Sequence, residues 1–335
     1  MFLRVLDNEA RNARPNAGRR AAFDASHLEI RMFHTGHGEA ILVVFEGSRA
    51  WMVDCGCTNG TRKNEILGRE IIAYMERRNL LLETIIPSHA HVDHAGAFAT
   101  ILQSNSTSVA PSVTIYRSDG FSWLRQDRDW LSAYRNALRV ADVEIPLRNA
   151  RREIAVAPNL TAIVYAGSGN SPYTSLFLQL RYHDARILFT GDAKCNYEVD
   201  LLDTFGDADF EADVLKVTHH GSSSGTATRV VQASAPGIAI VSTGEDTGHT
   251  LERDTLGRLG GHIGKPPSGS QGVRAVFETV VHGDIVLRTD GLGYYGGTLY
   301  QVELDDPGEF AGPLDTDILD PAVIVRTEKA HAGCN

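Results

Sequence analysis

Three histidines and one aspartate lie close together in the chain, at His89, His91, Asp93 and His94. They follow an apolar run at residues 84–87, which predicts the end of a short buried strand. Imidazole and carboxylate groups together bind zinc, and they accept iron or manganese less selectively. Residues two apart in an extended segment point the same way, so His89 and His91 could hold one ion. Beyond the bend, Asp93 and His94 could hold a second ion.

Three later segments repeat this arrangement, in which a predicted strand ends in side chains that can bind a metal. Asp192 ends one strand, His219 and His220 follow another, and His249 lies in the loop after a third. A carboxylate such as Asp192 can bridge two cations about 3.5–4 Å apart through its two oxygens. Each segment alone is a weak signal, since Gly-Asp is an ordinary turn and a His-His pair can occur by chance. Together, four strand ends that carry ligands predict a metal site at the edge of a sheet.

The apolar periodicity predicts strands that alternate with helices in one α/β domain. Helices are expected over residues 61–80 and 121–140, and a hairpin with His183 at its exposed tip is expected to join strands at 175–181 and 186–190. The other expected strands lie at residues 28–33, 40–45, 50–53, 84–87, 113–116, 143–146, 152–157, 161–165, 212–217, 237–241, 273–281, 285–288 and 298–304. We expect residues 1–27 to form an N-terminal extension, residues 28–305 the main domain and residues 306–335 a C-terminal tail.

The composition is that of a globular protein with ample material for a core: 335 residues, 42% hydrophobic and 22% charged. A formal net charge of -10 argues against broad non-specific binding to nucleic acid, although a local basic patch would be compatible with it. The cysteines form no disulfide framework and indicate a reducing compartment. We find no apolar run of about 18 residues and no signal-peptide core, so we expect a cytoplasmic protein with no membrane partner. The oligomeric state is left open.

The HxHxDH pattern at residues 89–94 resembles the signature of the metallo-β-lactamase superfamily. The HHGS sequence at residues 219–222 is similar to one branch of it, the soluble metallohydrolase domain of the ComEC/Rec2 competence proteins and its stand-alone relatives, including a phosphorylcholine esterase. The other matching pieces, in family order, are residues 33–40, 52–56, 173–176, 190–192 and 215–218. The resemblance implies an αββα sandwich, two mixed sheets flanked by helices, over residues 28–305.

The resemblance also implies a centre of two divalent metal ions, which we expect to be zinc, with manganese or iron as alternatives. The first ion would be held by His89 and His91, the second by Asp93, His94 and His220, and Asp192 would bridge the two.

The first of these sites is incomplete by the standard of the wider superfamily. The usual third histidine has no clear match here, because the single histidine in that interval is His183. The ComEC-like branch also tends to lack this ligand, so water or His249 could complete the site. Asp54 would orient a ligand histidine, although a turn former at a strand end is an equal interpretation.

The activity that the resemblance implies is metal-dependent hydrolysis, in which a metal-bridging hydroxide attacks a phosphodiester. Asp93 would be both a ligand and an orienter of that nucleophile, while His219 or His249 could bind a phosphate oxygen or protonate the leaving group. Each of these two histidines could instead be an ordinary packed or exposed residue. Arginines in the predicted helix at 121–140 would favour a phosphate-bearing substrate if they faced the metals; they are Arg125, Arg128, Arg135 and Arg139.

The substrate class stays open between three alternatives. A phosphodiesterase or nuclease is favoured by the branch resemblance, with a small diester or nucleic acid as substrate. The acidic net charge keeps an uncharged ester, lactone, thioester or β-lactam in consideration. A non-catalytic binding module with the same fold is the third alternative, and the complete ligand set argues against it.

Overall fold

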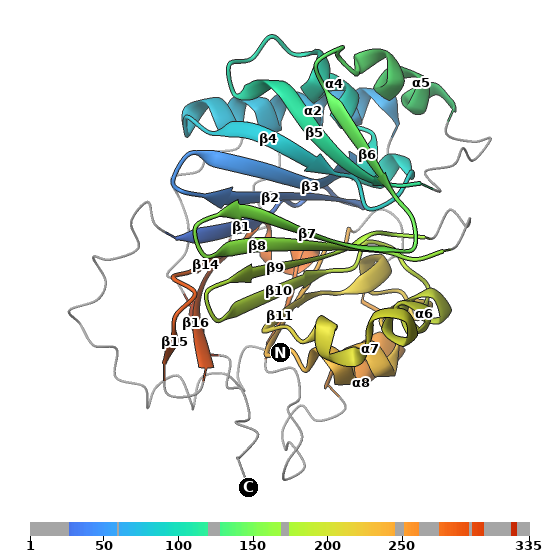
Figure 1. The fold of residues 1–335 in the computed structure, drawn as a ribbon, viewed down its shortest axis with the longest axis vertical. Helices are drawn as coiled ribbons and strands as arrows, with labels where there is room; N and C mark the ends of the chain where they lie inside the picture. The colour runs from blue at the N-terminus through green and yellow to red at the C-terminus, as the bar shows by residue number, and fades with distance from the viewer. Residues whose placement is uncertain are drawn as a thin grey trace, which may run out of the picture.

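The computed structural model describes residues 27–58, 60–119, 128–168, 174–244, 251–260, 275–294, 297–304 and 323–326. In this part of the chain, two β-sheets pack face to face and helices cover their outer surfaces (Figure 1). The predicted αββα sandwich of two mixed sheets is therefore confirmed. None of the helices described is long and apolar enough to cross a membrane.

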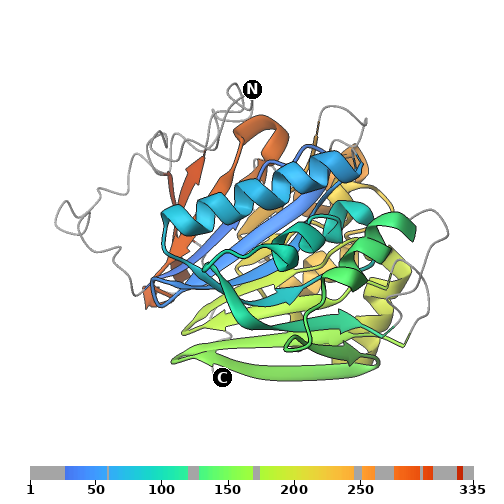
Figure 2. The same ribbon diagram turned by 90° about the horizontal axis from the view of Figure 1, so that it is seen from above.

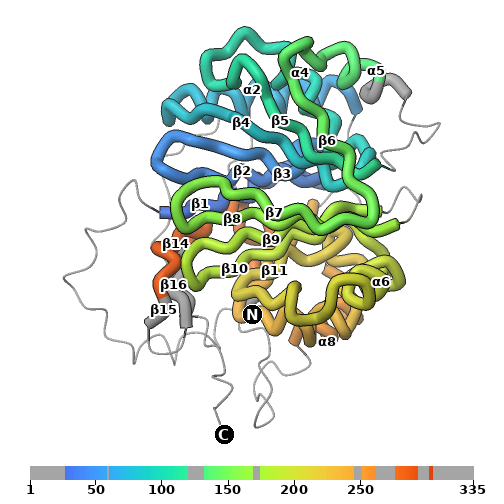
Figure 3. The backbone as a smooth tube through the Cα atoms, viewed as in Figure 1, coloured from blue at the N-terminus to red at the C-terminus, as the bar shows by residue number. Residues whose placement is uncertain are grey.

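The larger sheet contains ten of the described strands. They are β1 (Leu28–Met32), β2 (Gly38–Phe45), β3 (Arg49–Cys57), β4 (Leu81–Ile86), β5 (Val109–Ser118), β6 (Val143–Leu147), β14 (Ile285–Thr289), β15 (Gly293–Tyr294), β16 (Gly297–Leu304) and β17 (Val323–Arg326). Their order is β15-β16-β14-β1-β2-β3-β4-β5-β6, with β17 paired to β16. β2 and β3 form the predicted antiparallel pair, and β3 to β6 run parallel. β1 and β14 lie side by side although they are far apart in the sequence (Figure 3).

The smaller sheet contains seven of the described strands in the order β13-β12-β11-β10-β9-β8-β7. They are β7 (Ala150–Ala157), β8 (Leu160–Ala166), β9 (Phe177–Tyr182), β10 (Ala185–Phe189), β11 (Val214–Lys216), β12 (Ile238–Val241) and β13 (Ala275–Glu278). β7 to β10 are antiparallel neighbours, whereas β10 to β13 are parallel. The exposed His183 lies at the tip of the β9–β10 hairpin, as predicted.

Six helices of six or more residues flank the sheets within the described residues: α2 (Thr61–Arg77), α4 (Phe98–Gln103), α5 (Arg128–Ala137), α6 (Cys195–Phe205), α7 (Thr228–Ser234) and α8 (Arg253–Gly260). The first three pack on the larger sheet, where α2 runs along its outer face, and the last three pack on the smaller sheet (Figure 2). The shorter helical segments are α3 (Val92–Ala95), η1 (Asp207–Phe210), η2 (Thr218–Gly221) and α9 (Thr279–His282).

The apolar side chains form three layers, one between the sheets and one beneath each set of helices. In β2, Ile41 and Val43 face the layer between the sheets, while Leu42 and Val44 pack outward with Ile71 of α2. Alternation along a strand sends successive side chains to opposite faces, and here both faces are buried. This explains why the strand reads as a continuous apolar run in the sequence.

Two of the predicted elements differ from those observed in the structure. The strand predicted over residues 273–281 ends at Glu278, because Thr279 turns into α9 and its Oγ1 exchanges hydrogen bonds with the backbone of Thr243 at 2.9 and 3.0 Å. The helix predicted over residues 121–140 is observed as α5, while residues 120–127 lie outside the described part. Residues 1–26 also lie outside it, as does most of the predicted tail, although Val323–Arg326 of that tail pairs with β16. The domain boundaries stay a prediction.

Candidate metal centre

The ends of five strands from both sheets meet at one edge of the sandwich. Asp54 lies near the end of β3, and the segment of His89 to His94 follows β4. Asp192, His220 and Ser242 follow β10, β11 and β12 of the smaller sheet. Since both groups of strands are parallel, each sheet delivers its polar residues to a single edge.

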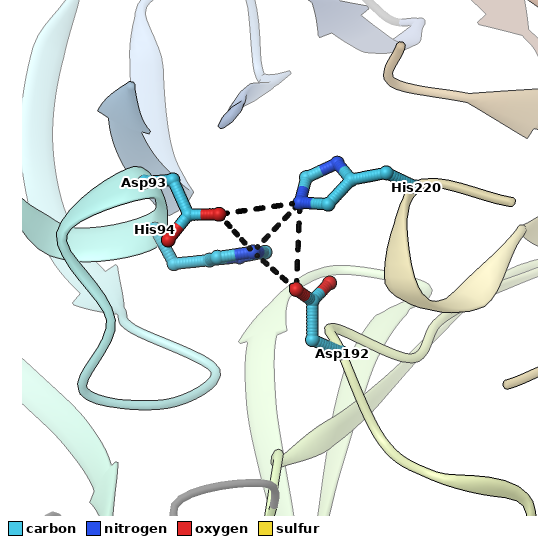
Figure 4. A group of neighbouring side chains, drawn as sticks. All are labelled: Asp93, His94, Asp192 and His220. Carbon is cyan, nitrogen blue, oxygen red and sulfur yellow. Dashed lines mark hydrogen bonds and ion pairs between the residues drawn. The ribbon is translucent and has the colours of Figure 1, made fainter. Parts of the chain in front are cut away.

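Asp93 and His94 of α3, Asp192 after β10 and His220 after β11 point toward one another, and all four are buried (Figure 4). Asp192 Oδ2 lies 3.1 Å from His94 Nε2 and 3.4 Å from His220 Nε2. Asp93 Oδ2 lies 3.5 Å from His220 Nε2 and 3.7 Å from His94 Nε2. Ligand atoms about 2.0–2.2 Å from one tetrahedral zinc are themselves about 3.3–3.5 Å apart. The four side chains therefore have the spacing of ligands around one ion.

The hydrogen bonds behind the two histidines define which nitrogens carry lone pairs. His94 Nδ1 donates to Asp54 Oδ2 at 2.9 Å, and His220 Nδ1 donates to the carbonyl of Ser242 at 3.0 Å. In the neutral imidazoles, both Nε2 atoms are consequently acceptors, yet they face each other at 3.2 Å. Two facing lone pairs beside two carboxylate oxygens repel one another unless a proton or a metal ion lies between them. This observation shows that the residues present fit a divalent metal ion.

The electrostatics of the group point to the same conclusion. Burial alone would raise the pKa of Asp192, but His220 and His94 hold it well below its usual value. Burial would lower the pKa of His220, but Asp192 and Asp93 raise it to about 9, and the pKa of His94 is raised for similar reasons. In the metal-free protein, protons supply the positive charge that the carboxylates require. The second carboxylate oxygen of Asp192, Oδ1, is buried and has no hydrogen-bond partner among the described residues, so it also suits a cation.

His89 and His91 form a second pair next to this group. His89 Nε2 lies 2.9 Å from His91 Nδ1, and the rings of His89 and His94 are 4.3 Å apart between centroids. Burial and His94 lower the pKa of His89, which keeps it neutral, as a metal ligand must be. The two nitrogens converge, and their role as ligands of a first ion stays a prediction. With two ligands this site is less complete than its neighbour.

The loop that carries His220 has an unusual backbone. His219 and His220 are both left-handed, with φ values of 53° and 51°, and Gly221 follows at 83°. Left-handed conformations are unfavourable for residues with a Cβ, so the surroundings must hold this loop. His219 N donates to Gly191 O at 3.0 Å, and the Thr218 hydroxyl donates to the buried Glu198 carboxylate at 2.6 Å. This backbone directs the buried His220 toward Asp93 and Asp192, whereas the side chain of the neighbouring His219 is partly exposed.

The sequence-predicted catalytic residues are distributed unevenly around the centre. Asp93 is in the four-residue group, and His219 Nε2 lies at its edge, 4.0 Å from Asp192 Oδ2. His249 lies outside the described residues. Asp54 accepts hydrogen bonds from both His94 Nδ1 and Ser88 N, which is the orienting geometry expected of it.

Sequence reasoning missed His37 as a member of the site. Its Nε2 lies 3.6 Å from Asp93 Oδ2, and its ring is 4.8 Å from that of His220 between centroids. The signal that could have identified it is a histidine between two glycines in a segment that matches the family. Gly38 is tightly enclosed, since a Cβ there would lie 2.2 Å from Gly56 O.

The arginines of the predicted helix at 121–140 give no support for a phosphate groove. Arg139 is bound to Asp142, with Nη2 2.8 Å from Oδ1, and α5 packs on the outer surface of the larger sheet. Arg125 and the side chain of Arg128 lie outside the described part, and Arg135 is exposed on α5.

Replacing Asp54 by Asn is expected to weaken metal binding by about 10–100-fold, as for other residues that orient a metal ligand. The carboxylate accepts hydrogen bonds from both His94 Nδ1 and Ser88 N, whereas an amide offers one acceptor and one donor. His94 would then protonate at Nε2 and lose its ligand lone pair. Asparagine tolerates the φ of 55° at this position, so the backbone should be retained. Metal titration monitored by calorimetry measures the effect, and unchanged affinity would contradict it.

Replacing Gly56 by Ala is expected to destabilise the fold by about 1–3 kcal/mol and to displace the metal-binding segment. A Cβ at Gly56 would lie 2.3 Å from Val92 O and 2.7 Å from Asp93 C, which are backbone atoms of α3. As a control, Gly257→Ala in α8 has no atom within 4 Å of the new Cβ and should stabilise by about 0.5–1 kcal/mol. Urea unfolding of the metal-free variants compares the two, and equal effects would refute the close approach at Gly56.

Comparisons with known proteins agree with this geometry. The profile of the metallo-beta-lactamase superfamily matches residues 35–245. The chain is 26% identical over 219 residues to Recombination protein 2 of Haemophilus influenzae, covering 64% of this chain and 24% of that protein. It is 28% identical over 239 residues to ComE operon protein 3 of Bacillus subtilis, covering 66% of this chain and 29% of that protein. The chain thus spans less than a third of the length of either curated relative.

Solved structures are similar at lower sequence identity. The metallo-beta-lactamase fold protein YhfI of Bacillus subtilis is similar over 78% of this chain and 99% of that chain, with 14% identity and a TM-score of 0.48. The short form of human tRNase Z is similar over 65% of this chain and 93% of that chain, with 14% identity and a TM-score of 0.41.

Proposed function

Because the chain belongs to the metallo-beta-lactamase superfamily, we propose that it is a metal-dependent hydrolase and that its substrates are phosphodiesters. The observation that supports this proposal best is the pair of facing Nε2 atoms of His94 and His220, 3.2 Å apart beside two carboxylates. Burying these groups without a cation costs free energy. With a bound cation they would form a reactive centre at the edge of the two sheets.

We propose that these residues divide into ligands for two adjacent ions. His89 and His91 would hold the first, while Asp93, His94 and His220 would hold the second, with Asp192 between them. Bound divalent ions supply a nucleophilic hydroxide at neutral pH and neutralise charge that develops on a phosphoryl oxygen. Zinc fits this mixture of imidazole and carboxylate ligands, and manganese or iron are the alternatives.

We expect the remaining polar groups, His219 and Asp93, to orient the reactants and to protonate the leaving group. The ring of His219 is fixed by a 2.8 Å contact between its Nδ1 and the Ser224 hydroxyl, which leaves Nε2 on the side of Asp192. The side chain of His219 is 22% exposed, whereas those of His94 and His220 are almost fully buried. A substrate can therefore reach His219, which would donate a hydrogen bond to a phosphate oxygen or a proton to the leaving group. Asp93 would hold the ion and orient the attacking group.

The test is hydrolysis of bis-(p-nitrophenyl) phosphate by protein loaded with zinc, manganese or iron. Turnover is expected in the wild type, loss of turnover in Asp93→Ala, and a decrease of about 10²–10⁴-fold in His219→Ala. His183→Ala is the matched control, since this exposed histidine at the tip of the β9–β10 hairpin should leave the rate unchanged.

Substrates of other classes decide between the alternatives. If the diester is not cleaved with any of the three metals while an acetate ester, lactone, thioester or β-lactam is, the phosphodiesterase proposal fails and the hydrolase remains. If nothing is cleaved by metal-loaded protein, a binding module is the better description. Where the diester is cleaved, single-stranded and duplex DNA and RNA separate a nuclease from an enzyme for small diesters.

A further inference from the structure

A fully buried ion pair lies directly behind the metal centre. The Lys216 ammonium contacts the Glu39 carboxylate, and the side chains of the two residues are 0% and 1% exposed. The same Nζ donates to Gly191 O at 3.0 Å and lies 3.9 Å from Asp192 Oδ1. Apart from Lys216, neither oxygen of Glu39 has a hydrogen-bond partner in the part of the chain that the structure describes. Each charge therefore depends on the other.

The pair joins three segments of the centre. Glu39 belongs to β2, next to the loop that carries His37, and Lys216 is the last residue of β11, four residues before His220. The third segment is the end of β10, which Lys216 contacts at the carbonyl of Gly191 and near the carboxylate of Asp192. One ammonium group thus touches the segments that present the bridging carboxylate and the histidine of the second ion.

A buried ion pair seldom stabilises a fold more than apolar side chains of the same volume would, so its position calls for another explanation. Asp192 directs Oδ2 toward His94 and His220. Its other oxygen, Oδ1, lies 3.9 Å from Lys216 Nζ and accepts no hydrogen bond from the residues that the structure describes. We propose that Lys216 and Glu39 are positioning residues, which hold the carboxylate of Asp192 in the orientation that binds metal. The inference rests on the metal centre of the proposed function and is independent of the substrate.

The charge arrangement explains why a lysine and a glutamate are both needed. A cation behind Asp192 opposes rotation of the carboxylate. The Lys216 ammonium is itself held in place by its contact with Glu39 and by its hydrogen bond to Gly191 O. Without Glu39, the buried ammonium would draw Asp192 toward itself and away from the histidines. The glutamate balances the lysine and leaves the Asp192 carboxylate available to the metals.

The double variant Glu39→Gln with Lys216→Met tests the proposal, because it removes both charges and leaves neither unpaired. Metal content per chain and zinc affinity, from competition with a chelator dye, are measured together with the melting temperature of the metal-free protein. We expect zinc affinity to fall by about 10–100-fold, the usual effect of residues that orient a ligand. The matched control is Arg31→Met with Asp284→Asn, a buried pair at 2.7 Å with 3% and 2% exposure that contacts no predicted ligand.

A merely structural pair would give equal results in the two double variants: similar melting temperatures and unchanged zinc affinity in both. That outcome would overturn the proposal. Should the double variant fail to fold, the charge-swapped protein, Glu39→Lys with Lys216→Glu, retains an ion pair but places a carboxylate beside Asp192. We expect it to bind zinc more weakly than the wild type, and full recovery of affinity would contradict the positioning role.

Failure of the positioning role of Lys216 and Glu39 can be distinguished from failure of the proposed function. A wild-type protein that binds no divalent metal would remove the metal centre and the hydrolase proposal with it. A wild-type protein that binds metal but cleaves no diester would remove the phosphodiesterase proposal alone, and the comparison of zinc affinities would still decide the role of Lys216 and Glu39.

Discussion

Asp192→Asn is expected to abolish turnover and to remove both metal ions. The carboxylate Oδ2 lies within 3.4 Å of two histidine Nε2 atoms, and no described residue donates a hydrogen bond to Oδ1, so the negative charge is available to metal ions. An amide offers one neutral oxygen and an NH₂ group that cannot bind a cation. Loss of several kcal/mol of charge stabilisation corresponds to a decrease of roughly 10³-fold or more in rate. Metal content per chain by mass spectrometry, together with the hydrolysis rate, measures both effects.

His91→Ala is the informative comparison for this variant. In a centre of two ions, His91→Ala should lose the ion next to His89 and retain the one at His94 and His220, whose ligands are spaced for an ion without His91. A centre with a single ion at His89 and His91 predicts the reverse order, with Asp192→Asn less damaging than His91→Ala. One retained ion and residual turnover in Asp192→Asn would therefore exclude the bridging role of this carboxylate.

The parts of the site that are adjacent in sequence could be predicted from the sequence. The HxHxDH pattern places four potential ligands, three histidines and one aspartate, directly after a strand, and the strand-end positions of Asp192 and His220 followed from apolar runs that are buried on both faces. Because parallel strands deliver their ends to one edge, strand ends alone predict that these residues meet. The αββα architecture followed from the same runs once the family resemblance was added.

Long-range side-chain contacts could not be predicted in this way. Lys216 lies within the strand predicted at residues 212–217, and Glu39 directly precedes the strand predicted at residues 40–45. Nothing local indicates that they form a buried pair. The left-handed backbone at His219 and His220 is held by distant groups such as Glu198 and Gly191, so local propensity says nothing about it. His37 lies 3.6 Å from Asp93, and the glycine at position 38 beside it allows β2 to approach β3 closely at Gly56. In each case the tertiary structure overrides what the local sequence favours.

Metal removal is expected to destabilise the protein, and more strongly at high pH. In the metal-free protein the pKa of His220 is raised to about 9 from an unfolded value near 6.5, and that of His94 is also raised. A raised folded pKa contributes stability that is complete below about pH 6.5 and is lost as the pH rises through about 9. Bound ions replace these protons, so the metal-loaded protein should not show this loss.

The measurement is the melting temperature with excess zinc and with chelator, at pH 6.5 and pH 9. Zinc at a thousand times its dissociation constant stabilises by about 4 kcal/mol, which corresponds to a rise of about 6 °C for a chain of this length. The difference between loaded and metal-free protein should be larger at pH 9, because His220 has then lost part of the protonation that balances the carboxylates of Asp93 and Asp192. His220→Gln provides the control, since it should flatten the pH dependence of the metal-free form. A metal-free wild type that is more stable at pH 9 than at pH 6.5 would show that these histidines do not carry the charge that balances the two carboxylates.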